Sequence, residues 1–156
     1  DQAVKDLRGE SKDAYPVRMF LKKGFGHGGL PDRDHLSTML PAVRNTIPES
    51  LVWESTDSVV RRFSWLENPE PSKKQLVEAT SKGNRFEIKL TGIESLNLYL
   101  DERIVDYRKP VVIEVNGKVA LERPLSPSLS VLCRTLLERG DPRFAFPSKI
   151  TFPKGL

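Results

Sequence analysis

One histidine stands where an apolar stretch of the sequence gives way to glycines. His27 lies in Gly26-His27-Gly28-Gly29, a few residues after the β-favouring segment 17–21. A histidine on a loop that follows a strand, between small residues that let a substrate approach, is a common arrangement for a general base. His27 is therefore the candidate catalytic residue, and the competing interpretation is a structural or merely exposed histidine.

A histidine base needs partners that this sequence does not show. Activation of a serine requires the hydroxyl within hydrogen-bond reach of the imidazole and a carboxylate that orients the ring. No GxSxG motif occurs, and Gly9-Glu10-Ser11-Lys12-Asp13 departs from it at the last position. The chain alone is therefore not expected to act as an enzyme.

The same loop also spells GxGxxG, at Gly24, Gly26 and Gly29. This pattern binds a dinucleotide when it joins a strand to a helix that leads into a second, parallel strand. Here Pro31 and Pro41 interrupt the helical segment that follows, and antiparallel hairpins come next. We therefore expect no cofactor.

Two other groups of reactive side chains have simpler explanations. Asp32, Asp34 and His35 gather at a predicted helix start, where the helix dipole favours acids, and the spacing of the two histidines is not a recognised ligand spacing. Cys133 falls among leucines in a second predicted helix, with no histidine near it in the sequence, which favours a place in the core. No metal site is expected.

Aromatic residues offer a binding alternative. Trp53, Phe63, Trp65 and Tyr99 could form a platform on which sugar rings stack, but at strand spacing such residues more often belong to a core. Exposed, coplanar rings would favour carbohydrate binding, and burial of the rings would count against it.

Residues 51–123 have the pattern of an antiparallel β-sandwich, because turn-forming residues separate short β-favouring segments about every 8 to 12 residues. Phe86, Ile88 and Leu90 alternate with charged residues, as in a half-buried strand. Asn116-Gly117 predicts a type I′ turn that pairs residues 111–115 with 118–122. The predicted strands are residues 51–54, 59–66, 75–80, 85–91, 96–100, 111–115 and 118–122, followed by an apolar extended stretch at 144–152.

Two helices are predicted. Leu36, Met39, Leu40 and Val43 have helical spacing and indicate a helix over residues 32–45. The second helix has Ser126 as N-cap, Pro127 at its first position and Gly140 as C-cap. We expect its apolar stripe to face the core; the stripe consists of Leu129, Leu132, Cys133, Leu136 and Leu137.

The predicted fold class is α+β. A mainly antiparallel, β-sandwich-like module with one amphipathic helix occupies residues 49–156, and a short strand-loop-helix segment occupies residues 1–48. The net charge of +4 (25 Lys and Arg against 21 Asp and Glu) is scattered in basic pairs among acids, so nucleic-acid binding is not expected. Apolar runs are far shorter than the roughly 20 residues that cross a bilayer, and no membrane span is expected.

Two stretches resemble parts of one enzyme family. Phe20-Leu21-Lys22-Lys23-Gly24-Phe25-Gly26-His27-Gly28 is similar to the last strand and histidine loop of serine-dependent α/β-hydrolases, in particular bacterial prolyl-oligopeptidase-like and esterase- or depolymerase-like members. Residues 98–147 resemble a β-rich C-terminal module that follows the hydrolase domain in some of these proteins. The motifs of this second likeness are Val105-Asp106, Lys109-Pro110-Val111, Val115-Asn116-Gly117-Lys118, residues 127–132 and residues 138–142.

The resemblance implies that His27 takes the place of the triad histidine and that residues 32–45 form the last hydrolase helix. The nucleophile, the acid and the oxyanion loop have no counterpart here, and Asp6, Asp13 and Asp32 do not match the motif of the acid. The implied partner is an upstream hydrolase domain of the same protein, acting on an ester or peptide bond, which the β-rich module supports, shields or docks.

Two alternatives stay open. In the first, the module is an independent carbohydrate- or protein-binding sandwich in which His27 is incidental. In the second, an apolar patch around residues 17–21, left bare by a missing neighbour, makes the chain a homo-oligomer.

Overall fold

The computed structural model describes residues 5, 23–24, 28, 32–41 and 43–152. Residue contacts divide the chain into two compact units, Asp1–Arg44 and Asn45–Leu156. The predicted strand at residues 17–21 and the candidate base His27 lie outside the described residues.

The helix predicted over residues 32–45 is shorter in the structure. A 3-10 turn, η1 (Asp32–His35), leads into a single α-helical turn, α2 (Leu36–Met39), which closes with the hydrogen bond from Leu40 N–H to Leu36 O at 2.8 Å. Pro41 has no N–H with which to continue this ladder, so the prediction is wrong beyond residue 40.

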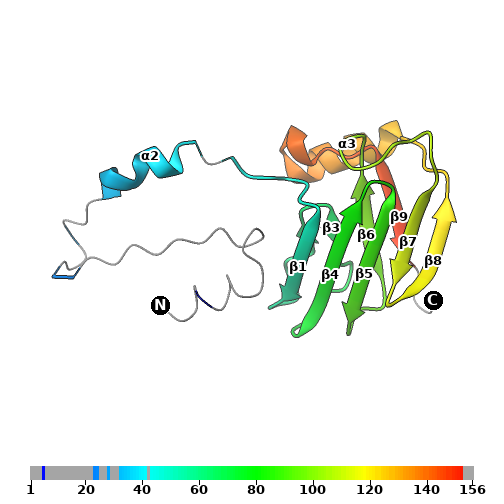
Figure 1. The fold of residues 1–156 in the computed structure, drawn as a ribbon, viewed down its shortest axis with the longest axis horizontal. Coiled ribbons are helices and arrows are strands. Elements are labelled where there is room, and N and C mark those ends of the chain that lie inside the picture. The colour runs from blue at the N-terminus through cyan, green and yellow to red at the C-terminus, as the bar shows by residue number, and fades with distance from the viewer. Residues whose placement is uncertain (1–4, 6–22, 25–27, 29–31, 42, 153–156) are drawn as a thin grey trace. The chain divides into compact units, whose positions relative to one another are not determined.

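The second unit contains two β-sheets and one longer helix (Figure 1), which confirms the predicted α+β, sandwich-like class. The five-stranded sheet has the order β1 (Ser50–Ser55), β4 (Gln75–Lys82), β5 (Arg85–Thr91), β7 (Val111–Val115), β8 (Lys118–Arg123). The four-stranded sheet has the order β2 (Arg62–Phe63), β3 (Leu66–Glu67), β6 (Leu96–Leu100), β9 (Ser148–Phe152). Between β8 and β9 lie α3 (Leu129–Arg139) and the 3-10 turn η2 (Pro142–Phe144).

The core forms between the sheets, and in β1, β4 and β5 buried residues alternate with more exposed ones. In β4 and β5, antiparallel pairing sets Ala79 opposite Ile88, and both are buried. Trp65 and Phe86 are fully buried, and their rings meet edge to face with centroids 5.7 Å apart. The predicted alternation of apolar and charged residues in β5 is confirmed, because one face of this sheet meets the core and the other meets solvent.

One strand prediction needs correction. Residues 59–66 are not one strand, because the chain turns at Ser64, which has a φ of 54°, and forms the short hairpin of β2 and β3. The β2–β3 hairpin pairs in the four-stranded sheet, so only part of the predicted segment is strand. The prediction of mainly antiparallel sheets is confirmed, with one parallel pair: β6 crosses to the four-stranded sheet, and the chain returns so that β7 pairs parallel to β5. The predicted Asn-Gly turn is confirmed, since Asn116 and Gly117 both have positive φ and β7 pairs antiparallel to β8.

The segment that enters the sandwich is held by its backbone carbonyls. The O of Thr46 accepts a hydrogen bond from Ser64 Oγ at 2.5 Å, the O of Pro48 from the Trp65 indole N–H at 2.9 Å, and the O of Glu49 from Ser81 N–H at 2.7 Å. The chain therefore enters the sandwich at a defined place, against the turn between β2 and β3 and against β4.

Candidate docking surface

The residues singled out for chemistry are not brought together in the part of the chain that the structure describes. His35 ends η1 and is half-buried, whereas Cys133 lies on α3 and is exposed. Among the described residues, no three His, Cys, Asp or Glu side chains gather as a metal site would require. The prediction that Cys133 fills the core is wrong.

The aromatic residues do not form an open platform. Trp53 is 8% exposed, Trp65 0% and Tyr99 3%. Phe63 is exposed, and its ring lies 6.0 Å from the Trp53 ring at an interplanar angle of 33°. Burial removes the flat, accessible ring faces on which a sugar would stack.

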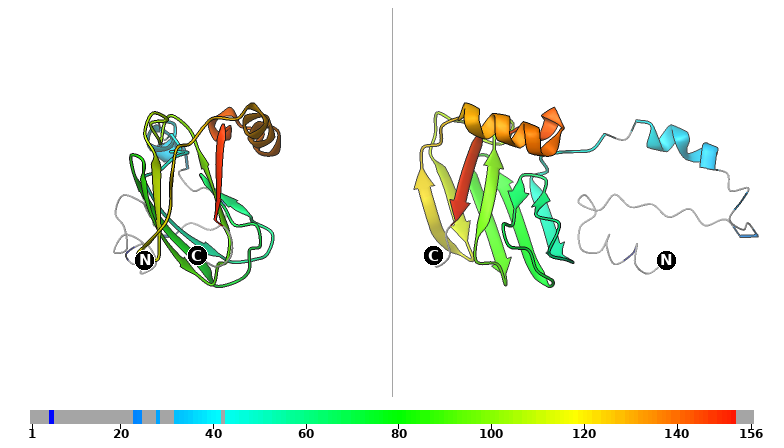
Figure 2. Two further views of the ribbon diagram at one scale, coloured as in Figure 1. Left: turned by 90° about the vertical axis from the view of Figure 1, so that its right-hand side faces the viewer. Right: turned by 180° about the vertical axis from the view of Figure 1, so that it is seen from behind.

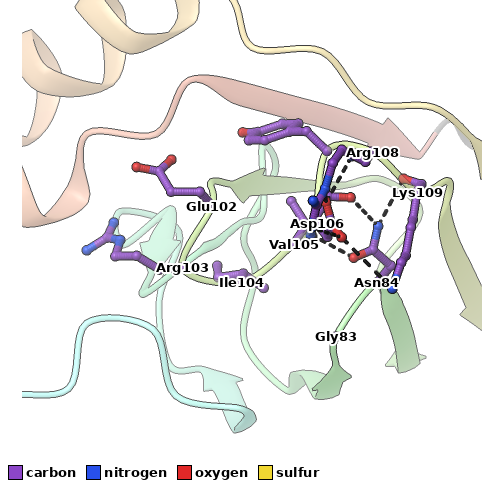
Figure 3. A pocket seen from close by; sticks show the side chains of 10 residues that line it. Gly83, Asn84, Glu102, Arg103, Ile104, Val105, Asp106, Arg108 and Lys109 are labelled. Carbon is purple, nitrogen blue, oxygen red and sulfur yellow. Dashed lines mark hydrogen bonds and ion pairs between the residues drawn. The ribbon is translucent and has the colours of Figure 1, made fainter.

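A shallow hollow of about 680 Å³ lies along the loop between β6 and β7 (Figure 3). The Asn84 amide, from the β4–β5 turn, donates to the O of Asp106 at 2.9 Å and to the O of Lys109 at 3.0 Å, and it accepts from Asp106 N–H. The guanidinium of Arg108 binds the Asp106 carboxylate and lowers the pKa of that carboxyl to about 2. These polar groups satisfy one another, so we attribute the contacts to shaping the loop.

A charged network covers the outer side of the four-stranded sheet. The Glu67 carboxylate is almost fully buried and accepts hydrogen bonds from Tyr99 Oη at 2.6 Å, Asn97 Nδ2 at 2.7 Å and Arg62 Nε at 2.9 Å. Lys149 Nζ lies 3.8 Å away. Burial alone raises the pKa of Glu67, but the hydrogen bonds from Tyr99, Asn97 and Arg62 outweigh it and hold the pKa below its ordinary value.

The same network fastens the C-terminal end of α3. Arg62 also binds Glu138 of the helix at 2.6 Å, and Arg139 Nη2 donates to the O of Ser64 at 3.0 Å. The Arg139 guanidinium lies 5.0 Å from the centre of the Phe144 ring. The last turn of α3 is therefore held by charged side chains rather than by its leucines.

A buried threonine fastens the middle of the helix. Thr135 Oγ1 donates to the O of Phe146 at 3.1 Å and accepts from Phe146 N–H at 2.9 Å. The same hydroxyl proton is also within reach of the O of Leu132 at 3.0 Å and of Val131 at 3.1 Å. Thr135 is 3% exposed, so the N–H of Phe146 obtains its acceptor away from water.

We expect Thr135→Val to lower the free energy of unfolding by about 1 to 3 kcal/mol, because the isosteric methyl group leaves the N–H of Phe146 buried without an acceptor. Urea denaturation measures this change. The matched control is Ser130→Ala on the exposed side of the same helix, for which we expect a change within about 0.5 kcal/mol. Equal stability of the two variants would contradict the assigned role of the Thr135 hydroxyl.

The prediction that the apolar stripe of α3 faces the core is wrong for most of its residues. Thr135 is buried, and Val131, Leu132 and Arg139 are half-buried. The remaining members of the stripe face solvent: Leu129 is 75% exposed, Leu136 41% and Leu137 84%, with Cys133 exposed between them. The helix lies beside β9, outside the space between the sheets, where hydrogen bonds of Thr135 and Arg139 determine which side is buried (Figure 2).

The exposed residues form one surface, which we name the α3 apolar face: Leu129, Cys133, Leu136 and Leu137. Their spacing of four, three and one residues places them on adjacent turns of one side of the helix. A contiguous apolar patch on a folded domain marks a surface for contact with another apolar surface. The spacing of the leucines in the sequence reveals an apolar stripe on the helix. Only the hydrogen bonds of Thr135 and Arg139 show that the side of α3 carrying these two residues is the buried one.

Comparison of the chain with protein-family models, with curated proteins and with solved structures gave no match. Across residues 32–41 and 43–152 and the shorter described segments, no helix is long and apolar enough to span a membrane.

Proposed function

We propose that the β-sandwich is a non-catalytic protein-docking module of a larger serine hydrolase. The α3 apolar face carries this proposal, because three leucines exposed together on one helix provide a surface for apolar contact. The resemblance of residues 20–28 and 98–147 to the C-terminal part of such enzymes supports the choice of enzyme class.

Protein contact is favoured over carbohydrate binding by the placement of the aromatic side chains. Recognition of a sugar by stacking needs rings whose faces reach solvent, whereas Trp65 and Tyr99 are buried and Trp53 is nearly so. The outer face of the five-stranded sheet presents charged residues instead, including Glu87 and Lys89.

In this proposal His27 is the base of a catalytic triad, and the serine and the acid of that triad belong to another part of the larger hydrolase. Proton transfer by an isolated imidazole, without a nucleophile and an orienting carboxylate, gives no efficient acyl transfer. The module then acts by binding the hydrolase domain rather than by chemistry of its own.

Hydrolysis of a p-nitrophenyl ester tests the proposed function. We expect the purified 156-residue chain to hydrolyse the ester no faster than buffer, and His27→Ala to leave that rate unchanged. The protein encoded by the entire reading frame is expected to hydrolyse it, with loss of activity in His27→Ala. Hydrolysis by the 156-residue chain that depends on His27, or a reading frame without a serine nucleophile, would overturn the proposal.

A further inference from the structure

We propose that two copies of the chain pair through β1, antiparallel about a two-fold axis at Val52, so that their five-stranded sheets join into one. β1 forms one edge of its sheet, and across residues 43–152 it pairs with β4 alone (Figure 1). This edge is distinct from the α3 apolar face, so the contact does not depend on the proposed function.

The sequence and register of β1 leave it open to pairing with another strand. Edge strands that avoid such pairing are commonly short, bulged, rich in lysine or proline, or covered by another segment. β1 is six residues long, and its register with β4 runs unbroken from Ser50 to Ser55. Its sequence, SLVWES, contains no lysine and no proline.

The other three sheet edges are each protected. The register of β8 with β7 shifts as at a β-bulge, and β8 carries three charged residues, Lys118, Glu122 and Arg123. In the four-stranded sheet, β2 is only two residues long. β9 is flanked at its start by the segment before α3, where Ser128 N–H donates to the O of Pro147 at 2.7 Å. β1 is therefore the edge that remains for the addition of a strand.

The backbone groups of β1 point alternately toward β4 and away from it. The carbonyl groups of Glu49 and Ser55 accept hydrogen bonds at 2.7 and 3.1 Å from N–H groups of β4 and of the residue before it. Because backbone groups alternate in direction along an antiparallel strand, those of Ser50, Val52 and Glu54 point to the open edge.

A second copy centred on Val52 uses all three of these residues. Val52 then lies opposite Val52 of the second copy, and Ser50 lies opposite Glu54. Each of the three pairs exchanges two main-chain hydrogen bonds, about six in all. At roughly one hydrogen bond per 100–200 Å² of interface, this number corresponds to a small interface and a dimer of modest affinity.

The side chains in this register complement one another. On the outer face, Val52 is 37% exposed and meets its own copy, and the Ser50 hydroxyl can donate to the Glu54 carboxylate. On the core side, Phe63 is 42% exposed and lies 6.0 Å from Trp53, so the added strand meets an apolar ring.

The antiparallel direction follows from the two faces of the sheet. Buried and exposed side chains alternate along β1, so one face of this strand belongs to the core and the other to solvent. A two-fold axis perpendicular to the sheet keeps both core faces on one side and both solvent faces on the other. Parallel pairing about a two-fold axis would set a core face beside a solvent face, which disfavours it.

A charged residue at position 52 tests the pairing, because the two copies of this side chain lie side by side at the axis. At about 0.1 mM, the 156-residue chain is expected to sediment as a dimer in analytical ultracentrifugation. Val52→Lys and Val52→Glu are each expected to raise the Kd of the dimer at least about tenfold, because like charges then face each other. An equimolar mixture of the two variants is expected to restore the dimer.

Val119→Lys is the matched control, since Val119 lies on the protected edge strand β8 and is 59% exposed. We expect this variant to leave the Kd of the dimer unchanged. Both valine side chains reach solvent, so we expect all the variants to fold, and circular dichroism checks that they do.

A wild-type chain that remains monomeric at about 0.1 mM would overturn the inference, as would a mixture of Val52→Lys and Val52→Glu that does not dimerise. A dimer that Leu137→Glu dissociates and Val52→Lys does not would place the contact on the α3 apolar face and would also overturn it.

Discussion

Replacing Glu67 by alanine is expected to lower the free energy of unfolding by about 3 to 5 kcal/mol, because it removes the acceptor shared by three buried or half-buried donors. Tyr99 Oη and Asn97 Nδ2 would keep their places without a partner, and Arg62 would retain only Glu138 in this network. Urea denaturation monitored by tryptophan fluorescence measures the loss.

The matched control is Glu87→Ala. Glu87 lies 3.6 Å from Arg85, and its side chain is 67% exposed, so the pair is screened by water and its removal is expected to cost less than about 1 kcal/mol. If Glu67→Ala were no more destabilising than Glu87→Ala, the charged network would not be what holds α3 and the sheet together.

The role of Glu67 can also be tested by measuring the free energy of unfolding of the wild type and of the isosteric variant Glu67→Gln at several pH values. The pKa of Glu67 in the folded protein lies below the ordinary value of 4.5, so the carboxylate contributes stability above that pH. This contribution is lost as the pH falls through the folded pKa. The free energy of unfolding of the wild type is therefore expected to exceed that of Glu67→Gln by its largest amount near pH 6, and this difference is expected to shrink below about pH 4.5.

Trp65→Ala is expected to be equally severe, with a loss of about 3 to 5 kcal/mol, because it opens a cavity in the centre of the sandwich. The ring is fully buried, packs edge to face on Phe86, and donates its indole N–H to the O of Pro48. Guanidinium denaturation measures this loss. Phe63→Ala, at a ring that is 42% exposed, is the control and is expected to cost less than half as much.

Trp65→Phe separates the two contributions of the indole. It retains an aromatic ring in the core but removes the hydrogen bond to Pro48, so we expect an intermediate loss of stability together with faster exchange of the Ser81 amide, which donates to the O of the neighbouring Glu49. Unchanged exchange of the Ser81 amide would contradict the role of Trp65 in anchoring the chain where it enters the sandwich.

Much of the sandwich was predictable because its strands carry local signals. Phe86, Ile88 and Leu90 alternate with charges in β5, and Asn116-Gly117 adopts at little cost the two positive-φ positions of the turn that joins β7 and β8. Gly140 ends α3 in the left-handed conformation, as the sequence predicts. The pairing of β5 with β7 was not predictable in the same way, because it depends on the passage of β6 into the other sheet.

The candidate surface was predictable only in part. The spacing of Leu129, Leu136 and Leu137 reveals an amphipathic helix, but it does not show whether another part of the fold covers the apolar side of that helix. The helix begins at Leu129, three residues after the predicted N-cap Ser126, and its buried side carries Thr135 and half-buried Arg139. Their hydrogen bonds to Phe146 and Ser64 depend on segments distant in the sequence.

The sequence by itself determined the class of the fold, most strand positions and the existence of one well-marked helix, because alternation, turn residues and caps act between neighbours in the chain. The tertiary structure alone decided that the leucines of α3 face solvent. Which side of a helix is covered depends on polar contacts between segments that fold together, and these contacts leave no periodic signal in the sequence.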